Sequence, residues 1–241
     1  MLSENEARDA IIVALDCGRD RALELARDLS GRVGWVKVGM TLFYAEGPAI
    51  VEAMRELGLK VFLDLKLHDI PFQVRGAAKS AALTGADLIS IHGLGASEMI
   101  AEARAGVEEA AAQSGRAPAE LVAITVLTSH DETSLAEIGV ASSVKDEVRR
   151  LASLAYGAGS NGIVCSPQEA AEMRGLLGPD ALIVCPGMRP AGADAGDQRR
   201  IATPAAAIAD GASRLVIGRP ITQAEDPAQA AEDIVKEMCS L

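Results

Sequence analysis

Short apolar runs alternate with helical patterns eight times along this chain, and the alternation is the strongest constraint on its fold. The predicted strands are residues 11–16, 33–39, 60–71, 87–92, 121–127, 162–165, 181–185 and 214–218. The third of these stretches ends where a predicted helix begins, at Pro71. The predicted helices are residues 19–29, 48–57, 71–83, 96–113, 132–138, 144–158, 167–177, 204–210 and 227–238. Eight such units in 241 residues, with no linker between them, predict an α/β fold: one (β/α)8 TIM barrel domain over residues 1–241.

An open, doubly wound sheet is the main alternative to a barrel, and it fits less well. Such a sheet usually has fewer strands and carries a G-x-G-x-x-G fingerprint after its first strand. The turn after the first predicted strand, at Cys17-Gly18, has no such fingerprint. The barrel is therefore favoured.

Composition narrows the class of protein. Hydrophobic residues make up 49% of the chain and aromatic residues only 2%, which indicates a globular chain with an aliphatic core. No apolar run approaches the ~18 residues of a membrane span, and residues 1–10 are polar and acidic rather than basic and then apolar as in a signal peptide. We therefore expect a soluble, cytoplasmic protein with no membrane partner.

Charge and cysteine spacing exclude further classes. A net charge of -11 disfavours binding to nucleic acid, although a local group of arginines or lysines could still hold a small anion. The four cysteines are scattered, with no C-x-x-C pair and no histidine nearby in the sequence. We therefore expect reduced thiols and neither a metal site nor a disulfide framework.

The third predicted strand carries charges in an apolar run. Asp64 and Lys66 are two residues apart, so an extended backbone points both side chains to the same face as Phe62. Asp and Lys are almost never fully buried unless they are paired. Together with Asp69 they predict a network of alternating charges at the mouth of the barrel, although Asp69 alone could be an ordinary acid at the start of a helix.

Other candidate residues fall at the carboxyl ends of predicted strands or in the turns that follow them, where barrels place their active sites. These residues are Asp16, Lys37, His92, Thr128, Pro186, Arg189, Gly218 and Arg219. Lys37 lies within an apolar strand, which favours a functional role, whereas Asp16 could begin a turn and His92 is typical of a packing residue. Gly218 and Arg219 combine a backbone N–H with a guanidinium, which suits phosphate. The small-residue loop 187–196 is either a mobile lid or a plain surface loop.

These motifs resemble a known family. Residues 63–71, Leu-Asp-Leu-Lys-Leu-His-Asp-Ile-Pro, resemble the D-x-K-x-x-D signature of the orotidine 5'-phosphate decarboxylase family. The resemblance continues along nearly the whole chain, at residues 13–16, 36–39, 46–48, 127–129, 164–167, 186–190, 197–199, 203–204 and 217–222. One departure is Phe72-Gln73, where the family commonly has Asn-Thr.

The resemblance implies a reaction and a set of catalytic residues. The substrate would be orotidine 5'-monophosphate, decarboxylated to uridine 5'-monophosphate in the last step of pyrimidine synthesis with no metal and no organic cofactor. Lys66 would donate the proton, within a network that also contains Lys37, Asp64 and Asp69. In the family Asp69 reaches the partner subunit's site, which implies a homodimer.

The resemblance also implies how the nucleotide is held. Asp16 and Lys37 correspond to ribose contacts and Thr128 to a pyrimidine contact. The phosphate contacts correspond to Gln198, Arg219 and the backbone N–H of Gly218, with Pro186 and Arg189 in or beside a closing loop.

Two alternatives stay open at the level of sequence. A magnesium-dependent sugar-phosphate decarboxylase or hexulose-phosphate synthase of the same superfamily shares a similar strand, but would need carboxylates free for the metal. A catalytically inactive barrel that only binds nucleotide is the other, although a pure binder would have no use for both lysines and both acids.

Overall fold

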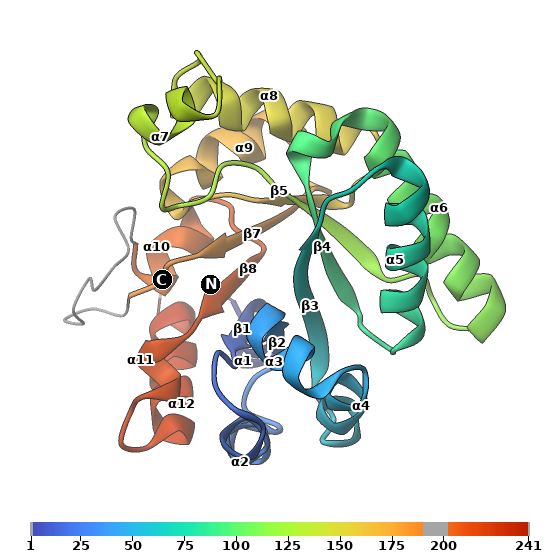
Figure 1. Ribbon diagram of the computed structural model, residues 1–241. Helices are drawn as coiled ribbons and strands as arrows, with labels where there is room; N and C mark the ends of the chain where they lie inside the picture. The colour runs from blue at the N-terminus through green and yellow to red at the C-terminus, as the bar shows by residue number, and fades with distance from the viewer. Residues whose placement is uncertain (1, 190–201, 241) are drawn as a thin grey trace.

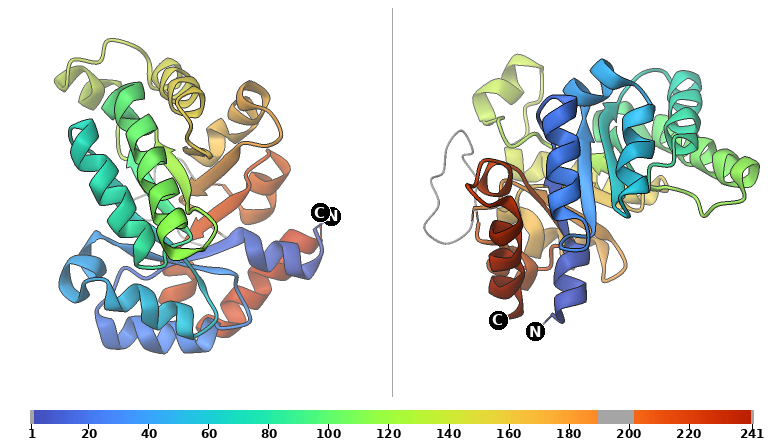
Figure 2. Two further views of the ribbon diagram at one scale, coloured as in Figure 1. Left: turned by 90° about the vertical axis from the view of Figure 1, so that its right-hand side faces the viewer. Right: turned by 90° about the horizontal axis from the view of Figure 1, so that it is seen from below.

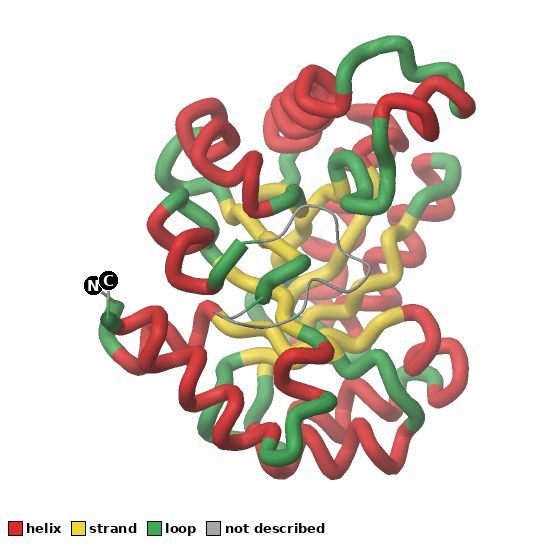
Figure 3. The backbone as a smooth tube through the Cα atoms, turned by 90° about the vertical axis from the view of Figure 1, so that its left-hand side faces the viewer, coloured by secondary structure: helices red, strands yellow, loops and turns green. Residues whose placement is uncertain are grey.

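The computed structural model of this chain describes residues 2–189 and 202–240, and its centre is a closed barrel of eight parallel strands. Neighbouring strands pair in sequence order, and β1 pairs with β8 to close the sheet. Figure 3 shows the strands inside a ring of helices. The strands are β1 (Ile11–Ala14), β2 (Trp35–Gly39), β3 (Lys60–Leu67), β4 (Leu88–His92), β5 (Glu120–Ile124), β6 (Gly162–Val164), β7 (Leu182–Pro186) and β8 (Arg214–Ile217). The predicted (β/α)8 barrel is confirmed.

The helices follow the strands as the sequence pattern predicts (Figure 1). The bounds of two of them match the prediction to the residue. The α-helices are α1 (Glu4–Ala10), α2 (Arg19–Leu29), α3 (Met40–Glu46), α4 (Ala49–Glu56), α5 (Pro71–Leu83), α6 (Ala96–Ser114), α7 (Glu132–Glu137), α8 (Val144–Gly157), α9 (Ala170–Leu177), α10 (Pro204–Ala209), α11 (Arg219–Thr222) and α12 (Pro227–Cys239). Two 3-10 turns, η1 (Gly93–Gly95) and η2 (Pro167–Glu169), precede α6 and α9. Pattern analysis predicts α2 and α5 with their observed bounds, because a glycine or proline marks the start of each.

Three short helices, α1, α3 and α11, are absent from the sequence prediction. A signal for α1 is present in the sequence: Ser3 and Glu6 form a capping box, in which each side chain accepts a hydrogen bond from the other residue's backbone N–H. Helix α1 lies beside α12 (Figure 2), and Arg8 pairs with Glu232 at 2.8 Å. The two ends of the described chain are therefore joined by an ion pair.

The core has two layers, as expected when both faces of a parallel sheet are covered. The larger layer lies between the sheet and the helices and is almost entirely aliphatic. The smaller layer fills the barrel interior with Ile12, Trp35, Phe62, Leu88, Val122, Leu182 and Val184. The interior is therefore packed, as in barrels generally.

The amino-terminal end of the barrel is closed by Trp35 and paired charges. The Arg214 guanidinium lies 4.0 Å from the centre of the Trp35 ring, and the Lys60 ammonium lies 5.0 Å from it. Arg214 also pairs with Glu120 at 2.7 Å, and Lys60 with Asp9 at 2.8 Å. These cations are therefore engaged in closing the amino-terminal end of the barrel. The charged residues predicted for the active site lie at the opposite, carboxyl end of the strands.

Candidate active site

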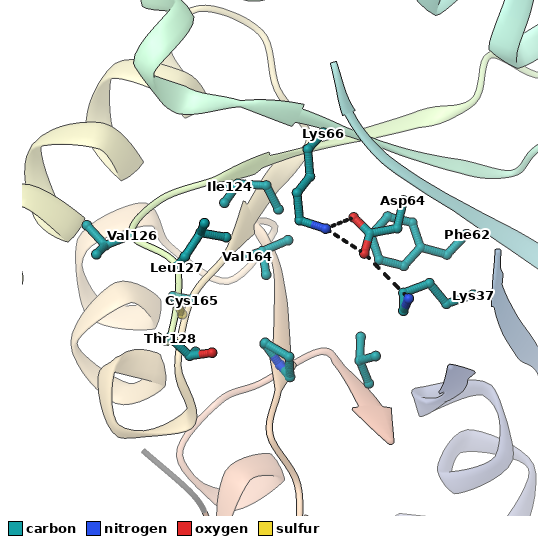
Figure 4. A pocket seen from close by; sticks show the side chains of 12 residues that line it. Lys37, Phe62, Asp64, Lys66, Ile124, Val126, Leu127, Thr128, Val164 and Cys165 are labelled. Atoms are coloured by element: carbon teal, nitrogen blue, oxygen red, sulfur yellow. Dashed lines mark hydrogen bonds and ion pairs between the residues drawn. The ribbon is translucent and has the colours of Figure 1, made fainter. Parts of the chain in front are cut away.

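A cavity of about 180 Å³ opens at the carboxyl ends of the strands (Figure 4). Its lining residues come from six of the eight strands or the loops that follow them, and they are Lys37, Phe62, Asp64, Lys66, Ile124, Val126, Leu127, Thr128, Val164, Cys165, Pro186 and Val216. Two lysines and one aspartate are the charged members of this otherwise mostly apolar set. The cavity can therefore bury a flat ring against an apolar wall while presenting charges from one side.

The charged wall is built from β2 and β3. Lys66 donates hydrogen bonds from Nζ to both carboxylate oxygens of Asp64, at 2.9 and 3.0 Å. Lys37 Nζ lies 3.7 Å from the same carboxylate, and Figure 4 shows the two ammonium groups on either side of it. Only 10% of the Lys37 side chain and 11% of the Asp64 side chain are exposed. Because charges so deeply buried are stable only when paired, the three groups form one unit.

Asp16 extends this unit at its solvent side. Its Oδ1 accepts a hydrogen bond from Lys37 Nζ at 2.9 Å, and its side chain is 68% exposed. Gly39 leaves room for this contact, since a Cβ there would lie 3.0 Å from Lys37 Nζ and 3.2 Å from Asp16 Oδ1. Within this chain the signs therefore alternate in the order Asp16, Lys37, Asp64, Lys66.

Strand β3 is irregular where it carries the catalytic candidates. The pairs Leu63↔Ile89 and Leu67↔Ile91 bracket a register shift, so that three residues of β3 face one residue of β4. Lys66 has a φ of 53°, a left-handed conformation that is uncommon for a residue other than glycine. Such conformations cost on the order of 1–3 kcal/mol and persist only where neighbouring contacts hold them. The side chains of Asp64 and Lys66 do share a face, as predicted, but on a bulged strand rather than a regular one.

Asp69 does not join the network within its own chain. It is exposed, it does not line the cavity, and its Oδ1 accepts a hydrogen bond from the backbone N–H of Ile70 at 2.6 Å. The predicted group of Lys37, Asp64, Lys66 and Asp69 is thus assembled here for the first three members only.

The predicted substrate-binding residues are distributed around the mouth. Thr128 and Pro186 line the cavity. Gly218 is partly buried and Arg219 exposed, directly after β8, whereas Arg189 is buried and donates from Nη1 to the carbonyl of Met188 at 2.8 Å.

Part of the proposed phosphate region is not described. Gln198, and residues 190–196 of the loop considered as a lid, lie outside the described residues.

Sequence reasoning missed Ser90 and most of the apolar lining. Ser90 is completely buried on β4, where its hydroxyl contacts both Asp64 and the backbone of Lys66. A single polar residue within the apolar run Leu-Ile-Ser-Ile is a signal that could have identified it. The apolar lining residues carry no comparable signal, because they look like any other strand residue.

The three histidines of the chain lie at the carboxyl ends of neighbouring strands: His92 is the last residue of β4, and His68 and His130 follow β3 and β5. His92 stacks on His68, with ring centroids 5.1 Å apart, and its Nδ1 accepts a hydrogen bond from Leu94 N at 3.3 Å. Burial, with smaller contributions from His68, Lys66 and His130, lowers the pKa of His92 to about 4. The ring is therefore neutral near pH 7 and packs beside the site, in line with the packing role that its position predicts.

The lowered pKa of His92 predicts a loss of stability in acid. The unfolded chain binds a proton at this residue near pH 6.5, whereas the folded chain does so only near pH 4. The contribution of the buried, neutral His92 ring to the free energy of unfolding is thus fully present above pH 6.5, and it is lost as the pH falls toward 4. With allowance for solvent screening of a partly exposed ring, we expect the free energy of unfolding to decrease by about 1 kcal/mol at about pH 5. This decrease corresponds to a fall in Tm of about 2–4 °C.

A variant isolates this effect from the other groups that titrate. Thermal unfolding of the wild type and of His92→Asn should be compared at about pH 7.5 and about pH 5. The fall in Tm on acidification should be smaller in the variant by about 2–4 °C. Equal falls in the two proteins would contradict the assignment to His92.

Among residues 2–189 and 202–240, no group of three or more His, Cys, Asp or Glu side chains is arranged to hold a metal ion. Within the same part of the chain, no helix combines the length and the apolar character that crossing a membrane requires.

Comparison with known proteins gives the same family along the chain. A family model described as "Orotidine 5'-phosphate decarboxylase / HUMPS family" matches residues 9–234. The orotidine 5'-phosphate decarboxylase of Anaeromyxobacter dehalogenans is 50% identical over 228 residues, which cover 94% of this chain and 96% of that protein. The protein of the same name from Paramagnetospirillum magneticum is 48% identical over 229 residues, which cover 95% of this chain and 97% of that protein.

A solved structure extends the similarity to three dimensions. The orotidine 5'-phosphate decarboxylase of Lactobacillus acidophilus superposes with a TM-score of 0.85 at 37% identity, over 95% of this chain and 99% of that one. The family match spans residues 9–234, which include the charged wall of the cavity, and each of these relatives covers at least 94% of the chain. The chain therefore belongs to the orotidine 5'-phosphate decarboxylase / HUMPS family.

Proposed function

We propose that this chain converts orotidine 5'-monophosphate into uridine 5'-monophosphate and carbon dioxide, the last step of de novo pyrimidine synthesis. The observation that carries the proposal is the Lys66 ammonium, held by both oxygens of Asp64 at the wall of a largely apolar cavity. The names of the relatives at 48–50% identity support the same reaction.

The chemistry explains why such a wall is needed. Breaking the bond between C6 of the pyrimidine and the carboxylate releases carbon dioxide and leaves the electron pair on C6. No conjugated group takes up that pair, so the protein must stabilise the developing charge with groups already in position. Lys66 does so as a cation and then transfers its proton to C6, and the resulting amine regains a proton from water.

Asp64 and Lys37 prepare Lys66 for this step. The Asp64 carboxylate, 2.9 Å from the Lys66 ammonium, pairs with it and aims it into the cavity. Asp64 lies where the substrate carboxylate would approach, and repulsion between the two like charges disappears as carbon dioxide leaves. Lys37 balances the second oxygen of Asp64, so that two cations surround one anion.

The remaining predicted residues bind the parts of the nucleotide that do not react. Asp16 and Lys37, joined at 2.9 Å, bind the ribose hydroxyls, and Thr128 contacts the pyrimidine from the opposite wall. Gln198, Arg219 and the Gly218 N–H bind the phosphate, with Pro186 and Arg189 nearby at the end of β7 and just after it. Binding energy from the phosphate then contributes to organising the charged wall.

The active unit in this proposal is a homodimer. Two large apolar side chains next to Asp69 face solvent, Ile70 at 63% exposure and Phe72 at 78%. An exposed apolar patch of this kind is typical of an interface. A partner subunit packed on it would receive Asp69 into its own cavity, which gives a role to a carboxylate that lies outside the cavity of its own chain. Phe72 and Gln73, where the family commonly has Asn-Thr, would also lie at this interface.

The family name covers a second chemistry, and one assay separates the two. Orotidine 5'-monophosphate should lose its absorbance when mixed with the protein in excess EDTA, because no step of the proposed reaction uses a metal. A magnesium-dependent enzyme of the superfamily would leave the nucleotide unchanged under these conditions. The contacts of Asp64 favour the first outcome, since its oxygens already accept hydrogen bonds from Lys66 and Ser90.

The same assay tests for an inactive nucleotide-binding barrel. Such a protein would bind uridine 5'-monophosphate without consuming orotidine 5'-monophosphate in either the presence or the absence of magnesium. That result would overturn the proposed function.

A further inference from the structure

We infer that Ser90 is a positioning residue for this reaction: its hydroxyl fixes both the Asp64 carboxylate and the backbone of Lys66. The inference rests on the proposed function. Ser90 touches neither the cavity nor any reacting atom, so it would act only through these two neighbours.

Its position at the register shift is the first observation. Between the pairs Leu63↔Ile89 and Leu67↔Ile91, β3 contributes three residues and β4 contributes Ser90 alone. A register shift of this kind interrupts the regular ladder of backbone hydrogen bonds. The Lys66 N–H donates instead to Ser90 Oγ, at 2.8 Å. A side chain thus supplies the acceptor that Lys66 uses at this point.

The direction of the two hydrogen bonds is determined by their chemistry. A serine hydroxyl has one hydrogen to donate and two lone pairs to accept with. The Lys66 backbone N–H can only donate, so Ser90 Oγ accepts there, and its own hydrogen is directed to Asp64 Oδ1 at 2.8 Å. The hydroxyl therefore has one arrangement, and it ties the backbone at Lys66 to the carboxylate that holds the Lys66 ammonium.

Lys66 itself needs this support. Its φ of 53° is uncommon for a lysine and requires neighbouring contacts to maintain it. Without the Ser90 hydroxyl, the backbone is free to return to an ordinary conformation, and the carboxylate loses the contact that sets its rotation. Both changes would move the ammonium away from C6, and small displacements of a catalytic group are costly to rate.

The alternative is a purely structural role, in which Ser90 only fills space in a buried strand. Ser160 provides a matched control, because it is also buried and its hydroxyl contacts the carbonyls of Leu121 and Gly162, at the start of β6 and away from the cavity. Ser160→Ala removes a buried hydroxyl of the same kind without touching the charged wall.

The experiment compares wild type, Ser90→Ala, Ser90→Thr and Ser160→Ala with orotidine 5'-monophosphate as substrate. In Ser90→Ala we expect kcat to fall by about 30-fold, with KM and the Kd for uridine 5'-monophosphate within about threefold of wild type. Its Tm should fall no further than that of Ser160→Ala, which keeps wild-type kcat. Ser90→Thr retains the hydroxyl and should recover most of the lost kcat.

Each of the other outcomes contradicts the inference about Ser90. An unchanged kcat in Ser90→Ala overturns the inference alone, provided that the wild type is active. Failure of Ser90→Ala to fold, a parallel loss of nucleotide binding, or an equal loss of kcat in Ser160→Ala would assign Ser90 a structural role and also overturn it. A wild-type protein that does not consume the substrate overturns the proposed function, and the inference with it.

Discussion

Replacing Lys66 by alanine should lower kcat/KM for orotidine 5'-monophosphate by about 10⁴-fold or more, since general acid catalysis and charge stabilisation are lost together. Nucleotide binding should persist, because the ribose, pyrimidine and phosphate contacts come from other residues. The measurements are the rate of absorbance loss and the Kd for uridine 5'-monophosphate. A variant that keeps substantial turnover would remove Lys66 from the role of proton donor.

Lys60→Ala is the matched control for this variant. Lys60 begins the same strand, but at the closed end of the barrel, where it pairs with Asp9 at 2.8 Å and lies over the Trp35 ring. Its loss should lower Tm slightly and leave kcat/KM within about twofold of wild type, since exposed ion pairs contribute little. An equal loss of activity in both variants would point to general damage to β3.

The Lys66 variant also tests the homodimer. If each site takes Lys66 from one subunit and Asp69 from the other, homodimers of Lys66→Ala and of Asp69→Ala should both be inactive. A mixed dimer with one subunit of each variant should have one complete site. After subunit exchange at equal concentrations, about one quarter of the sites should be complete. Activity that does not rise above that of the separate variants would contradict a shared site.

Replacing Arg219 by alanine should lower kcat/KM by about 10²–10³-fold, because a guanidinium forms strong, charge-assisted hydrogen bonds to phosphate. The nucleoside orotidine, which has no phosphate, identifies the cause. The wild type should be slower on orotidine than on the nucleotide, and Arg219→Ala should cause no further loss on it. An equal fractional loss on both substrates would contradict a phosphate contact.

Arg214→Ala is the control for Arg219. Arg214 is the first residue of β8 and Arg219 follows that strand, but Arg214 lies at the closed end of the barrel, paired with Glu120 and stacked on Trp35. Its removal should lower Tm, because a cation–π contact and an ion pair are lost together, while kcat/KM for the nucleotide stays within about threefold of wild type.

The order of strands and helices was available from sequence because local patterns set it. Pro71 and the glycine that follows α5 mark that helix to the residue, and Gly18 does the same at the start of α2. The candidates at strand ends were also available, since a charge inside an apolar run, as at Lys37, has few uses in a core. Short helices such as α3 were missed because a single turn or two gives little periodicity to detect.

The geometry that turns these residues into a site came only from the tertiary structure. Asp64 and Lys66 share a face in any extended strand, but the register shift beside Ser90 depends on how β3 pairs with β4 in the closed sheet. The pairing of Lys37 with Asp16 likewise depends on β1 and β2 being neighbours, and the isolation of Asp69 depends on the path of the chain into α5. Sequence by itself therefore determined most of the elements, the family, and the charged residues Lys37, Asp64 and Lys66 that the structure brings together. The distances among those groups are long-range properties, decided by closure of the barrel and by the pairing and register of strands that helices separate in the chain.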